Sequence, residues 1–289
     1  LSCQSDVQFC YGAAFLDVYV GDRNRMNRLQ RLGYGLIWIL LAVSLNGCGE
    51  PRWPAYEFLQ GSTMGTYYRV QYAPSAACRP SQFAIEQQLI AFNQSLSTYI
   101  EDSELSLLNE VPAQQTRTMS ERLSVALTAA LELWRDTDGA FDVTVGPLVN
   151  VWGFGPDKAV QWPPTERSQR VAAASVGMQH IELLPNRQIR KHLATTFIDL
   201  SSIAKGQAVD EVSQIMTSLG CEHFLVDIGG EVQASGLNSE RRPWRIGIEV
   251  PRSGQQGSVQ RVLSVTDNSV ATSGDYRNFR VVDGLRVDH

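Results

Sequence analysis

The stretch from Asp138 to Pro156 most constrains what this chain can fold into. Its glycines favour turns and close backbone approach over a helix, and its apolar residues are poorly suited to a solvated loop. It begins with two acids, Asp138 and Asp142, and an acid within an apolar run needs a donor or a cation. We therefore expect a non-helical segment. It is either a turn whose acids cap backbone amides or the wall of a ligand site.

The composition argues against nucleic acid as a partner and against a cysteine metal site. The formal net charge is −5 and the pI is near 5.5, whereas phosphate backbones require a basic surface. The five cysteines include no CxxC pair and no zinc-ligand spacing. Cys78 and Cys221 would lie in an oxidising compartment if the chain is exported. Whether they pair depends on a Cα separation that the sequence does not give.

Residues 26–47 have the pattern of a secretory signal. Arg28 and Arg31 precede an apolar run at 36–45, which is too short to span a bilayer at roughly 20 residues per helix. The run does fit the apolar region of a signal peptide. The segment that ends at Cys48 resembles a bacterial lipobox, in which the cysteine is lipidated after cleavage. The alternative is a short buried helix that happens to end near a cysteine.

The signal divides the chain into four parts. We expect residues 1–25 to be upstream sequence without a structural role and 26–47 to be the lipoprotein signal peptide. Residues 48–55 would then be a tether, and 56–289 would form one folded domain. The mature protein is expected in the bacterial periplasm, held to a membrane by the lipid on Cys48, with the inner membrane favoured over the outer.

Apolar periodicity after the tether predicts helices and strands without a regular βαβ alternation, which favours an α+β fold. Helices are predicted after Ser81 and Ser120, and a shorter one is predicted to be capped by Asp102. Two more are predicted at 163–176 and through Leu219. Strands are predicted at 56–60, 67–72, 179–184, 188–191, 196–200, 224–228, 231–235, 244–250, 261–266, 269–272 and 276–282.

The junction from Asp199 to Gly206 is a candidate for chemistry. A strand is predicted to turn into a helix here, and the free N–H groups at a helix N-terminus bind anions such as phosphate. Lys205, predicted in the first helical turn, would face the positive end of the helix dipole, and a bound anion would resolve that conflict. The alternative is a solvated lysine on a serine-capped helix. Asp227 and Glu231 flank two glycines, and this arrangement is typical of a hairpin.

The familiar nucleotide and hydrolase motifs do not occur in the sequence. Neither glycine cluster has the GxGxxG or GxxxxGK[ST] spacing, which argues against Rossmann and P-loop sites. No GxSxG segment is present, which argues against a serine hydrolase. His180, His192 and His223 are therefore expected to be structural or surface residues.

Several segments taken together resemble the ApbE family of bacterial lipoproteins, which are flavin transferases. The blocks occur in the family's order between Tyr56 and His289. They are Thr63–Thr66, Leu96–Tyr99 with Asp102–Glu104, Asp138–Pro147 with Trp152–Gly155, Asp199–Gly206, Val226–Glu231 and Ala271–Arg277.

The resemblance implies a single α+β flavin-binding body, T-fold-like, with a mixed, largely antiparallel sheet and flanking helices. It also implies an enzyme that uses Mg²⁺ to transfer FMN from FAD to a Thr or Ser hydroxyl of an acceptor protein, releasing AMP. Flavoprotein subunits of a membrane or periplasmic redox system would be the acceptors. The cofactor-binding residues that it implies are Met64, Tyr99, Ala140, Phe141, Asp142, Asp199, Lys205, Thr272 and Ser273.

The resemblance also implies a metal site and a base. The backbone carbonyl of Ser202 would bind Mg²⁺, and His289 is a candidate base near the reactive phosphate. The family pattern continues past this histidine with an Asp-Pro-x-Thr segment that supplies two metal ligands. Because this chain ends at His289, we expect it to lack those ligands and to be weakly active or inactive. Two alternatives stay open: an FAD pyrophosphatase that gives FMN and AMP, and a non-catalytic periplasmic lipoprotein that binds flavin.

Overall fold

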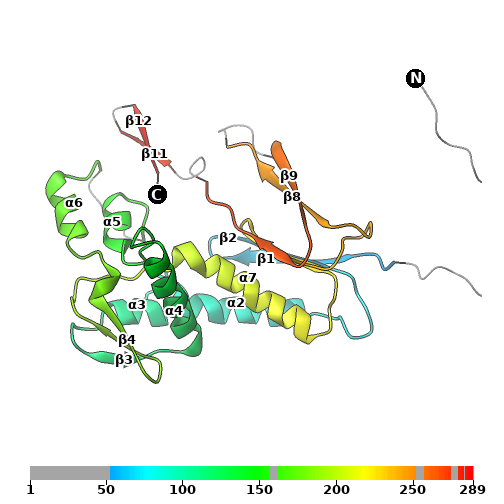
Figure 1. Ribbon diagram of the computed structural model, residues 1–289, viewed down its shortest axis with the longest axis horizontal. Coiled ribbons are helices and arrows are strands. Elements are labelled where there is room, and N and C mark those ends of the chain that lie inside the picture. Colours follow the sequence, from blue (N-terminus) through cyan, green and yellow to red (C-terminus); the bar gives the residue numbers. More distant parts are fainter. Residues whose placement is uncertain (1–52, 157–161, 252–256, 275–278, 283, 289) are drawn as a thin grey trace, which may run out of the picture. The chain divides into compact units, whose positions relative to one another are not determined.

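An antiparallel sheet of five strands forms the centre of the fold in the computed structural model (Figure 1). The structure describes residues 53–156, 162–251, 257–274, 279–282 and 284–288, within a unit that runs from Pro54 to His289. The strand order is β1–β2–β6–β7–β10. The strands are β1 (Glu57–Thr63), β2 (Thr66–Tyr72), β6 (Phe224–Ile228), β7 (Glu231–Ser235) and β10 (Asn268–Val270).

Three long helices bury their apolar faces in one large core with this sheet. α2 (Gln82–Leu96) packs against β1 and α7, and α7 (Ser201–Ser218) packs against β6 and β7. α4 (Glu121–Asp136) packs against both of these helices. The helix predicted after Ser81 from apolar periodicity is confirmed, and the apolar residues that α2 buries are Ile85, Leu89, Phe92 and Leu96. The caps predicted at Ser81 and Ser120 are confirmed as well, because each hydroxyl accepts a backbone N–H from the first turn.

The smaller elements complete the α+β architecture that the sequence predicts. The short helices are α3 (Glu104–Asn109), α5 (Gly146–Val151), α6 (Glu166–Ala173) and the 3₁₀ turn η1 (Met178–His180). A second sheet has the order β3 (Thr116–Thr118), β5 (Gln188–Lys191), β4 (Ile181–Leu184). Two separate ribbons pair β8 (Trp244–Glu249) with β9 (Val259–Val265) and β11 (Phe279–Val282) with β12 (Leu285–Asp288). No helix within the described stretches is both long and apolar enough to cross a membrane.

Two local predictions near the start of the domain are wrong. The first strand does not stop at Gln60 but continues through Gly61 to Thr63, because Gly61 faces Tyr68 across the ladder. A Cβ at Gly61 would come within 2.5 Å of the Tyr68 ring, so a glycine is needed there. The helix predicted to be capped by Asp102 is capped by Ser103, whose hydroxyl accepts the N–H of Ser106.

The prediction that 196–200 forms a strand is also wrong. This segment has no ladder partner, and its backbone is held by a side chain instead. The amide of Asn109 accepts the N–H of Ile198 at 2.8 Å and donates to its carbonyl at 2.9 Å. The fully buried Lys191 donates to the carbonyl of Thr196 at 3.3 Å, and burial lowers the pKa of this lysine. The backbone groups of Thr196 and Ile198 are therefore bonded without a neighbouring strand, although the Thr196 hydroxyl is buried without a hydrogen-bond partner.

The 138–156 stretch contains one turn and a half of helix, contrary to the prediction that it would be non-helical. α5 begins at Gly146 and has a proline in its first turn, where a missing N–H costs nothing. It ends at Val151, just before Gly153, whose φ of 72° terminates it. The glycines therefore bound the helix and do not prevent it.

A disulfide bond joins Cys78, in the connection between β2 and α2, to Cys221, just after α7. The Cα atoms are 4.7 Å apart, within the range that a disulfide requires, and both residues are buried. The pairing that the sequence left open is therefore present in the structure. It ties the sheet to the C-terminal end of α7 at a point where β6 begins.

Because the side chains of Tyr68 and Tyr72 are buried, we expect the protein to lose stability at high pH. Tyr68 donates to Glu86 at 2.9 Å and Tyr72 donates to Glu57 at 2.6 Å. Burial, followed by the neighbouring carboxylate, raises the pKa of each tyrosine to about 12. Because the unfolded chain loses these protons at about pH 10, the free energy of unfolding should fall between pH 10 and 12. Each phenol contributes about 2–3 kcal/mol of this loss at most.

Urea unfolding from pH 9 to 11.5 measures this loss. Tyr68→Phe should make the pH dependence shallower, because the replaced side chain has no proton to lose. Tyr67→Phe is the matched control on the same strand, since Tyr67 is exposed. Equal slopes in Tyr68→Phe and the unaltered chain would contradict the prediction.

Candidate active site

Asp199 fixes the start of α7. Its N–H donates to the carbonyl of Val143 at 2.7 Å, which joins it to the 138–156 stretch. Its Oδ1 accepts the N–H of Ser201 at 2.8 Å and the Ser201 hydroxyl at 2.5 Å. A negative charge at this position is favoured by the helix dipole. Asp199 therefore binds the first N–H group of α7, while the N-cap position itself is Leu200 and not the serine expected from sequence.

Lys205 forms an ion pair with Glu231. Its Nζ lies 2.8 Å from both carboxylate oxygens, and the side chains are 35% and 14% exposed. Lys205 is the fifth residue of α7, so it lies in the second turn and not in the predicted first. A cation near the N-terminal end of a helix is unfavourable by itself, and Glu231 provides the compensating anion. The lysine is therefore not simply solvated, and its contact with an anion stays a prediction.

The turn between β6 and β7 brings Thr272 close to Gly230. Gly229 and Gly230 both have positive φ, and the N–H of Gly230 donates to Asp227 Oδ1 at 3.0 Å. A Cβ built on Gly230, the neighbour of Glu231, would lie 3.7 Å from the Thr272 hydroxyl. The hairpin predicted from the two flanking acids is therefore confirmed. Its acids have separate roles, because one shapes the turn and the other binds Lys205.

Asp142 is bound by backbone and hydroxyl donors. Its Oδ1 accepts the N–H of Thr144 at 2.7 Å and the Thr144 hydroxyl at 2.5 Å. Its Oδ2 accepts the N–H of Met178 at 3.0 Å. The Thr144 hydroxyl in turn accepts the N–H of Gly177 at 2.6 Å. The acid therefore caps backbone amides, as the first alternative from sequence expected, and contact with a cofactor stays a prediction.

Tyr99 lies between the 138–156 stretch and the start of α7. Its hydroxyl donates to the carbonyl of Phe154 at 3.4 Å, while most of the side chain is exposed. Burial of the hydroxyl raises the pKa of Tyr99, and the nearby negative charge of Asp199 raises it further. A Cβ on Gly146 would come within 3.4 Å of the Asp199 Cβ. Tyr99, Asp199 and the beginning of α5 are therefore neighbours.

The structure thus places the predicted residues in three groups. Tyr99 lies near Asp199 at the start of α7, while Lys205 binds Glu231 and Thr272 lies against Gly230 at the β6–β7 turn. Met64, at the β1–β2 turn, and Phe141 are half-buried against the large core, whereas Ala140, Ser202 and Ser273 are exposed. Cys48 and His289 lie outside the described residues.

The described residues do not by themselves complete a magnesium site. Across residues 53–156, 162–251, 257–274, 279–282 and 284–288, no three His, Cys, Asp or Glu side chains cluster as a metal site requires. The Ser202 carbonyl lies in the first turn of α7, where helical geometry directs it toward the N–H four residues on. It could offer a metal only its second lone pair.

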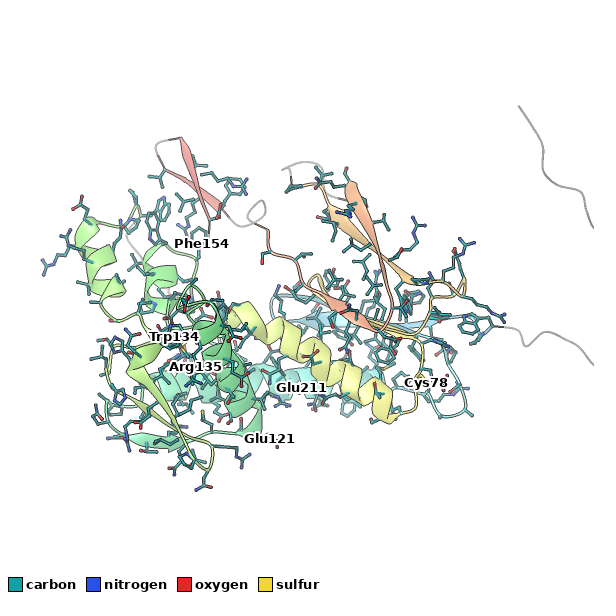
Figure 2. The ribbon with its side chains drawn as sticks, in the orientation of Figure 1. Cys78, Glu121, Trp134, Arg135, Phe154 and Glu211 are labelled. Carbon is teal, nitrogen blue, oxygen red and sulfur yellow. A yellow bond between two sulfur atoms is a disulfide. The ribbon has the colours of Figure 1, made fainter. Side chains whose placement is uncertain are left out.

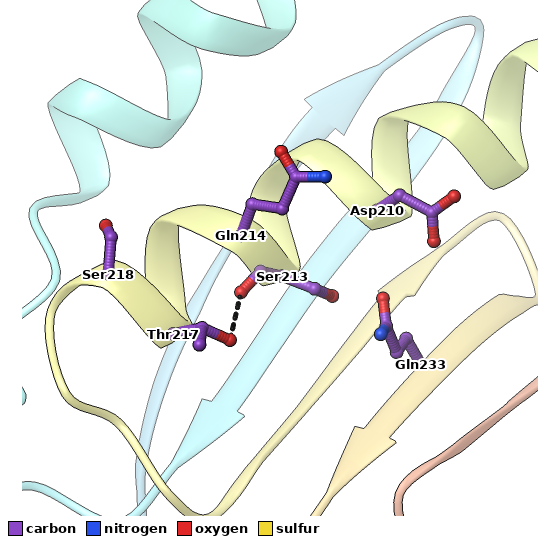
Figure 3. Close-up of a pocket in the computed structure, with 6 residues that line it drawn as sticks. All are labelled: Asp210, Ser213, Gln214, Thr217, Ser218 and Gln233. Carbon is purple, nitrogen blue, oxygen red and sulfur yellow. Dashed lines mark hydrogen bonds between the residues drawn. The ribbon is translucent and has the colours of Figure 1, made fainter.

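The pocket beside the C-terminal half of α7 is separate from these groups (Figure 3). Its volume is about 420 Å³, and it contains none of the predicted site residues. Burial raises the pKa of Asp210 at its edge. The lining residues are Asp210, Ser213, Gln214, Thr217, Ser218 and Gln233. The pocket therefore gives no support to the predicted flavin site.

Two participants at the site were missed by sequence reasoning. Glu231 was assigned only to a hairpin, although its charge complements Lys205. The amide of Asn109, which holds the segment leading to Asp199, has no local signal at all, because its partner lies 89 residues away. Both contacts depend on the packing of distant elements.

The fold is that of an α+β protein in which predicted site residues lie at the start of α7 and at the β6–β7 turn. The ApbE family profile matches residues 64–289. An FAD:protein FMN transferase from Vibrio cholerae is 39% identical over 258 residues, which cover 87% of this chain and 76% of that protein. One from Salmonella typhimurium is 36% identical, with coverage of 88% and 75%. The chain belongs to the ApbE family.

Solved structures agree with this assignment. The flavin transferase ApbE from Vibrio cholerae superimposes with a TM-score of 0.73 at 38% identity, covering 79% of this chain and 74% of that one. The ApbE protein from Thermotoga maritima gives a TM-score of 0.73 at 30% identity, with coverage of 81% and 75%. The α+β fold inferred from the family resemblance is confirmed.

Replacing Asp142 with alanine should destabilise the loop and weaken FAD binding together. The change removes the acceptor of three hydrogen bonds and leaves the buried Thr144 without its carboxylate partner. We expect a loss of about 2–3 kcal/mol in the free energy of unfolding. Denaturant unfolding and a flavin-fluorescence titration measure the two effects. Asp138→Asn, at the same stretch, is the control, because asparagine tolerates the φ of 50° at this position. Unchanged FAD affinity in Asp142→Ala would show that the loop does not contribute to the flavin site.

Proposed function

We propose that this enzyme transfers FMN from FAD to a Thr or Ser hydroxyl of an acceptor protein and releases AMP. The observation that carries the proposal is the Lys205–Glu231 pair beside the start of α7, in a chain whose relatives are FAD:protein FMN transferases. A lysine held by a carboxylate keeps its charge and its position until a stronger anion arrives. The pyrophosphate of FAD, with two negative charges, is such an anion.

The reaction requires one bond to form and one to break. The acceptor oxygen attacks the phosphorus on the FMN side of the pyrophosphate, and the bond from that phosphorus to the AMP phosphate breaks. AMP departs with the electron pair of the broken bond, and the acceptor hydroxyl releases its proton. In this proposal, Lys205 holds the negative charge that develops on the phosphates.

The flavin half is assigned to the surfaces around Tyr99 and Phe141. Tyr99 is largely exposed beside Asp199, so its ring is available to stack on a planar ligand. Met64 and Phe141 contribute apolar surface from the core side. Asp142 and Asp199 hold the two loops that carry these groups. Thr272 and Ser273 close the site from the far side, next to the glycine turn.

We also propose that transfer depends on Mg²⁺, with the Ser202 carbonyl as one ligand. When bound, the metal would neutralise charge on the pyrophosphate. The described residues offer too few ligands to fix the position of the metal. His289 is kept as a candidate base and lies outside the described residues.

A lipid anchor on Cys48 and a periplasmic location form part of the same proposal. The lipobox-like sequence at 45–48 supports it, and a disulfide between Cys78 and Cys221 fits an oxidising compartment. The acceptors would then be flavoprotein subunits of a membrane or periplasmic redox system, with the inner membrane favoured. Cys48→Ala should release the protein from the membrane fraction, and continued sedimentation with membranes would contradict the anchor.

One incubation tests the reaction. The chain is mixed with FAD, Mg²⁺ and an acceptor protein that carries a Thr-containing target segment, and the products are separated on a denaturing gel. Flavin fluorescence that stays on the acceptor supports transfer, and a Thr→Ala acceptor is the control. Free FMN without labelled acceptor would indicate the pyrophosphatase alternative. FAD binding without either product, in a chain that also carries the Asp-Pro-x-Thr segment of the family, would indicate a flavin-binding lipoprotein.

A further inference from the structure

Arg280, on strand β11, makes three contacts with residues that are distant in sequence. Its Nη2 donates to the carbonyl of Gly153 at 2.6 Å. Its guanidinium lies over the ring of Trp162 at 4.7 Å from the centroid and near the ring of Phe154 at 5.8 Å. Phe154 is labelled in Figure 2. One side chain therefore joins the β11–β12 ribbon to the end of α5.

The position of Gly153 is fitted to this arginine. A Cβ there would come within 2.7 Å of Arg280 Nη2, and the φ of 72° also disfavours a side chain. The next residue, Phe154, offers its carbonyl to the Tyr99 hydroxyl. The contact of Arg280 with this loop is therefore one residue away from a group assigned to the flavin site.

Thr272 is held by contacts of its own. β10 pairs with β7 just before it, and Thr272 lies against Gly230. The contact of Arg280 with Gly153 is separate from these and concerns the loop that carries Phe154.

We infer that Arg280 is a positioning residue for FAD, which holds the loop that carries Phe154, the hydrogen-bond partner of Tyr99, in its binding arrangement. This inference rests on the proposed function. Arg280 does not contact the phosphates in this scheme. It acts through Gly153 and the two aromatic rings, so its effect is expected on FAD affinity and not on the chemical step.

Arg280→Ala should raise the Kd for FAD roughly tenfold, because a charge-assisted hydrogen bond and two cation–π contacts are lost. The KM for FAD should rise by a similar factor while kcat at saturating FAD stays unchanged, the signature of lost uniform binding. Arg280→Lys keeps the charge but loses the planar fork of the guanidinium. Its Kd for FAD should therefore lie between the values of the unaltered chain and of Arg280→Ala. Flavin-fluorescence titration and steady-state rates of the full chain measure these values.

Arg286→Ala is the matched control. Arg286 lies on the same ribbon, and its guanidinium is over Phe279 at 4.4 Å, within the ribbon itself. This variant removes the same charge and should leave the Kd for FAD within twofold. A tryptophan readout does not depend on FAD: Arg280→Ala should shift the emission of the free protein, and a Trp162→Phe background should abolish that shift. If Arg280→Ala does not fold, Gly153→Ala displaces the guanidinium from the other side and should raise the Kd likewise.

The outcomes separate the two proposals. A Kd unchanged in Arg280→Ala, or raised equally in Arg286→Ala, overturns the role of Arg280 and leaves the flavin-transfer proposal intact. A fall in kcat with unchanged KM would also overturn it, because the arginine would then act on the chemical step. Absence of FAD binding by the unaltered chain would contradict the proposed function together with this inference.

Discussion

Lys205→Met is expected to lower the rate of flavin transfer by roughly 10²–10³, because it removes the cation assigned to the pyrophosphate. The replacement has a similar length and no charge. It also leaves Glu231, whose side chain is only 14% exposed, without its cation. We expect a cost of about 1 kcal/mol in the free energy of unfolding, since the lysine itself is partly exposed.

Glu231→Gln separates catalysis from structure. If Lys205 leaves Glu231 to bind FAD, the weaker partner should release the lysine more easily, and the affinity for FAD should rise. If the ion pair is only structural, Lys205→Met and Glu231→Gln should lower the stability alike and leave FAD affinity unchanged. Titration with FAD and urea unfolding of both variants distinguish these outcomes. Unchanged transfer by a folded Lys205→Met protein would remove Lys205 from the site.

Loss of the disulfide is expected to have the largest effect on stability. The bond between Cys78 and Cys221 closes a loop with a sequence separation of 143 residues. The chain-entropy relation gives about 5 kcal/mol for a loop of this length, an upper value because the reduced unfolded chain keeps some structure. We expect the free energy of unfolding to fall by about 2–5 kcal/mol in a Cys78→Ala, Cys221→Ala double variant.

Urea unfolding with and without a reductant measures this loss. The reduced chain and the double variant should agree, and the double variant should not respond to the reductant. FAD affinity of the folded variant should be unchanged, because the 18 residues of α7 separate Cys221 from Asp199 by about 27 Å along the helix. Equal stability of the oxidised and reduced chains would contradict the prediction.

Local sequence patterns predicted the elements whose signals are local. The stripes of α2 and α4, their serine caps, and the hairpins of β4 with β5 and β6 with β7 all follow from residues within one element or one turn. The glycine content of the 138–156 stretch argues against a helix, so local sequence does not predict α5. In the structure these glycines lie at the ends of the helix, where they do not destabilise it.

At the candidate site, too, local segments predict some residues but not the partners that these residues bind. Its residues were named from segments that resemble the ApbE family, and several of them are neighbours in the structure. Their partners were not predicted. Glu231 binds Lys205 across 26 residues, Asn109 binds Ile198 across 89, and Arg280 binds Gly153 across 127. Such contacts depend on how whole elements pack, and no spacing rule within a segment reports them.

The topology of the central sheet has a consequence for how the chain folds. β2 and β6 are neighbours, with Tyr68 opposite Ile228, so the middle of the sheet closes a loop that contains most of the domain. Loops of this kind slow folding, because their entropy is lost before the contacts form. Until β6 has been synthesised and pairs with β2, the β1–β2 hairpin exposes the unpaired edge of β2. An unpaired edge readily binds other chains, so newly made protein should be most prone to aggregate in the interval before residue 228 is available.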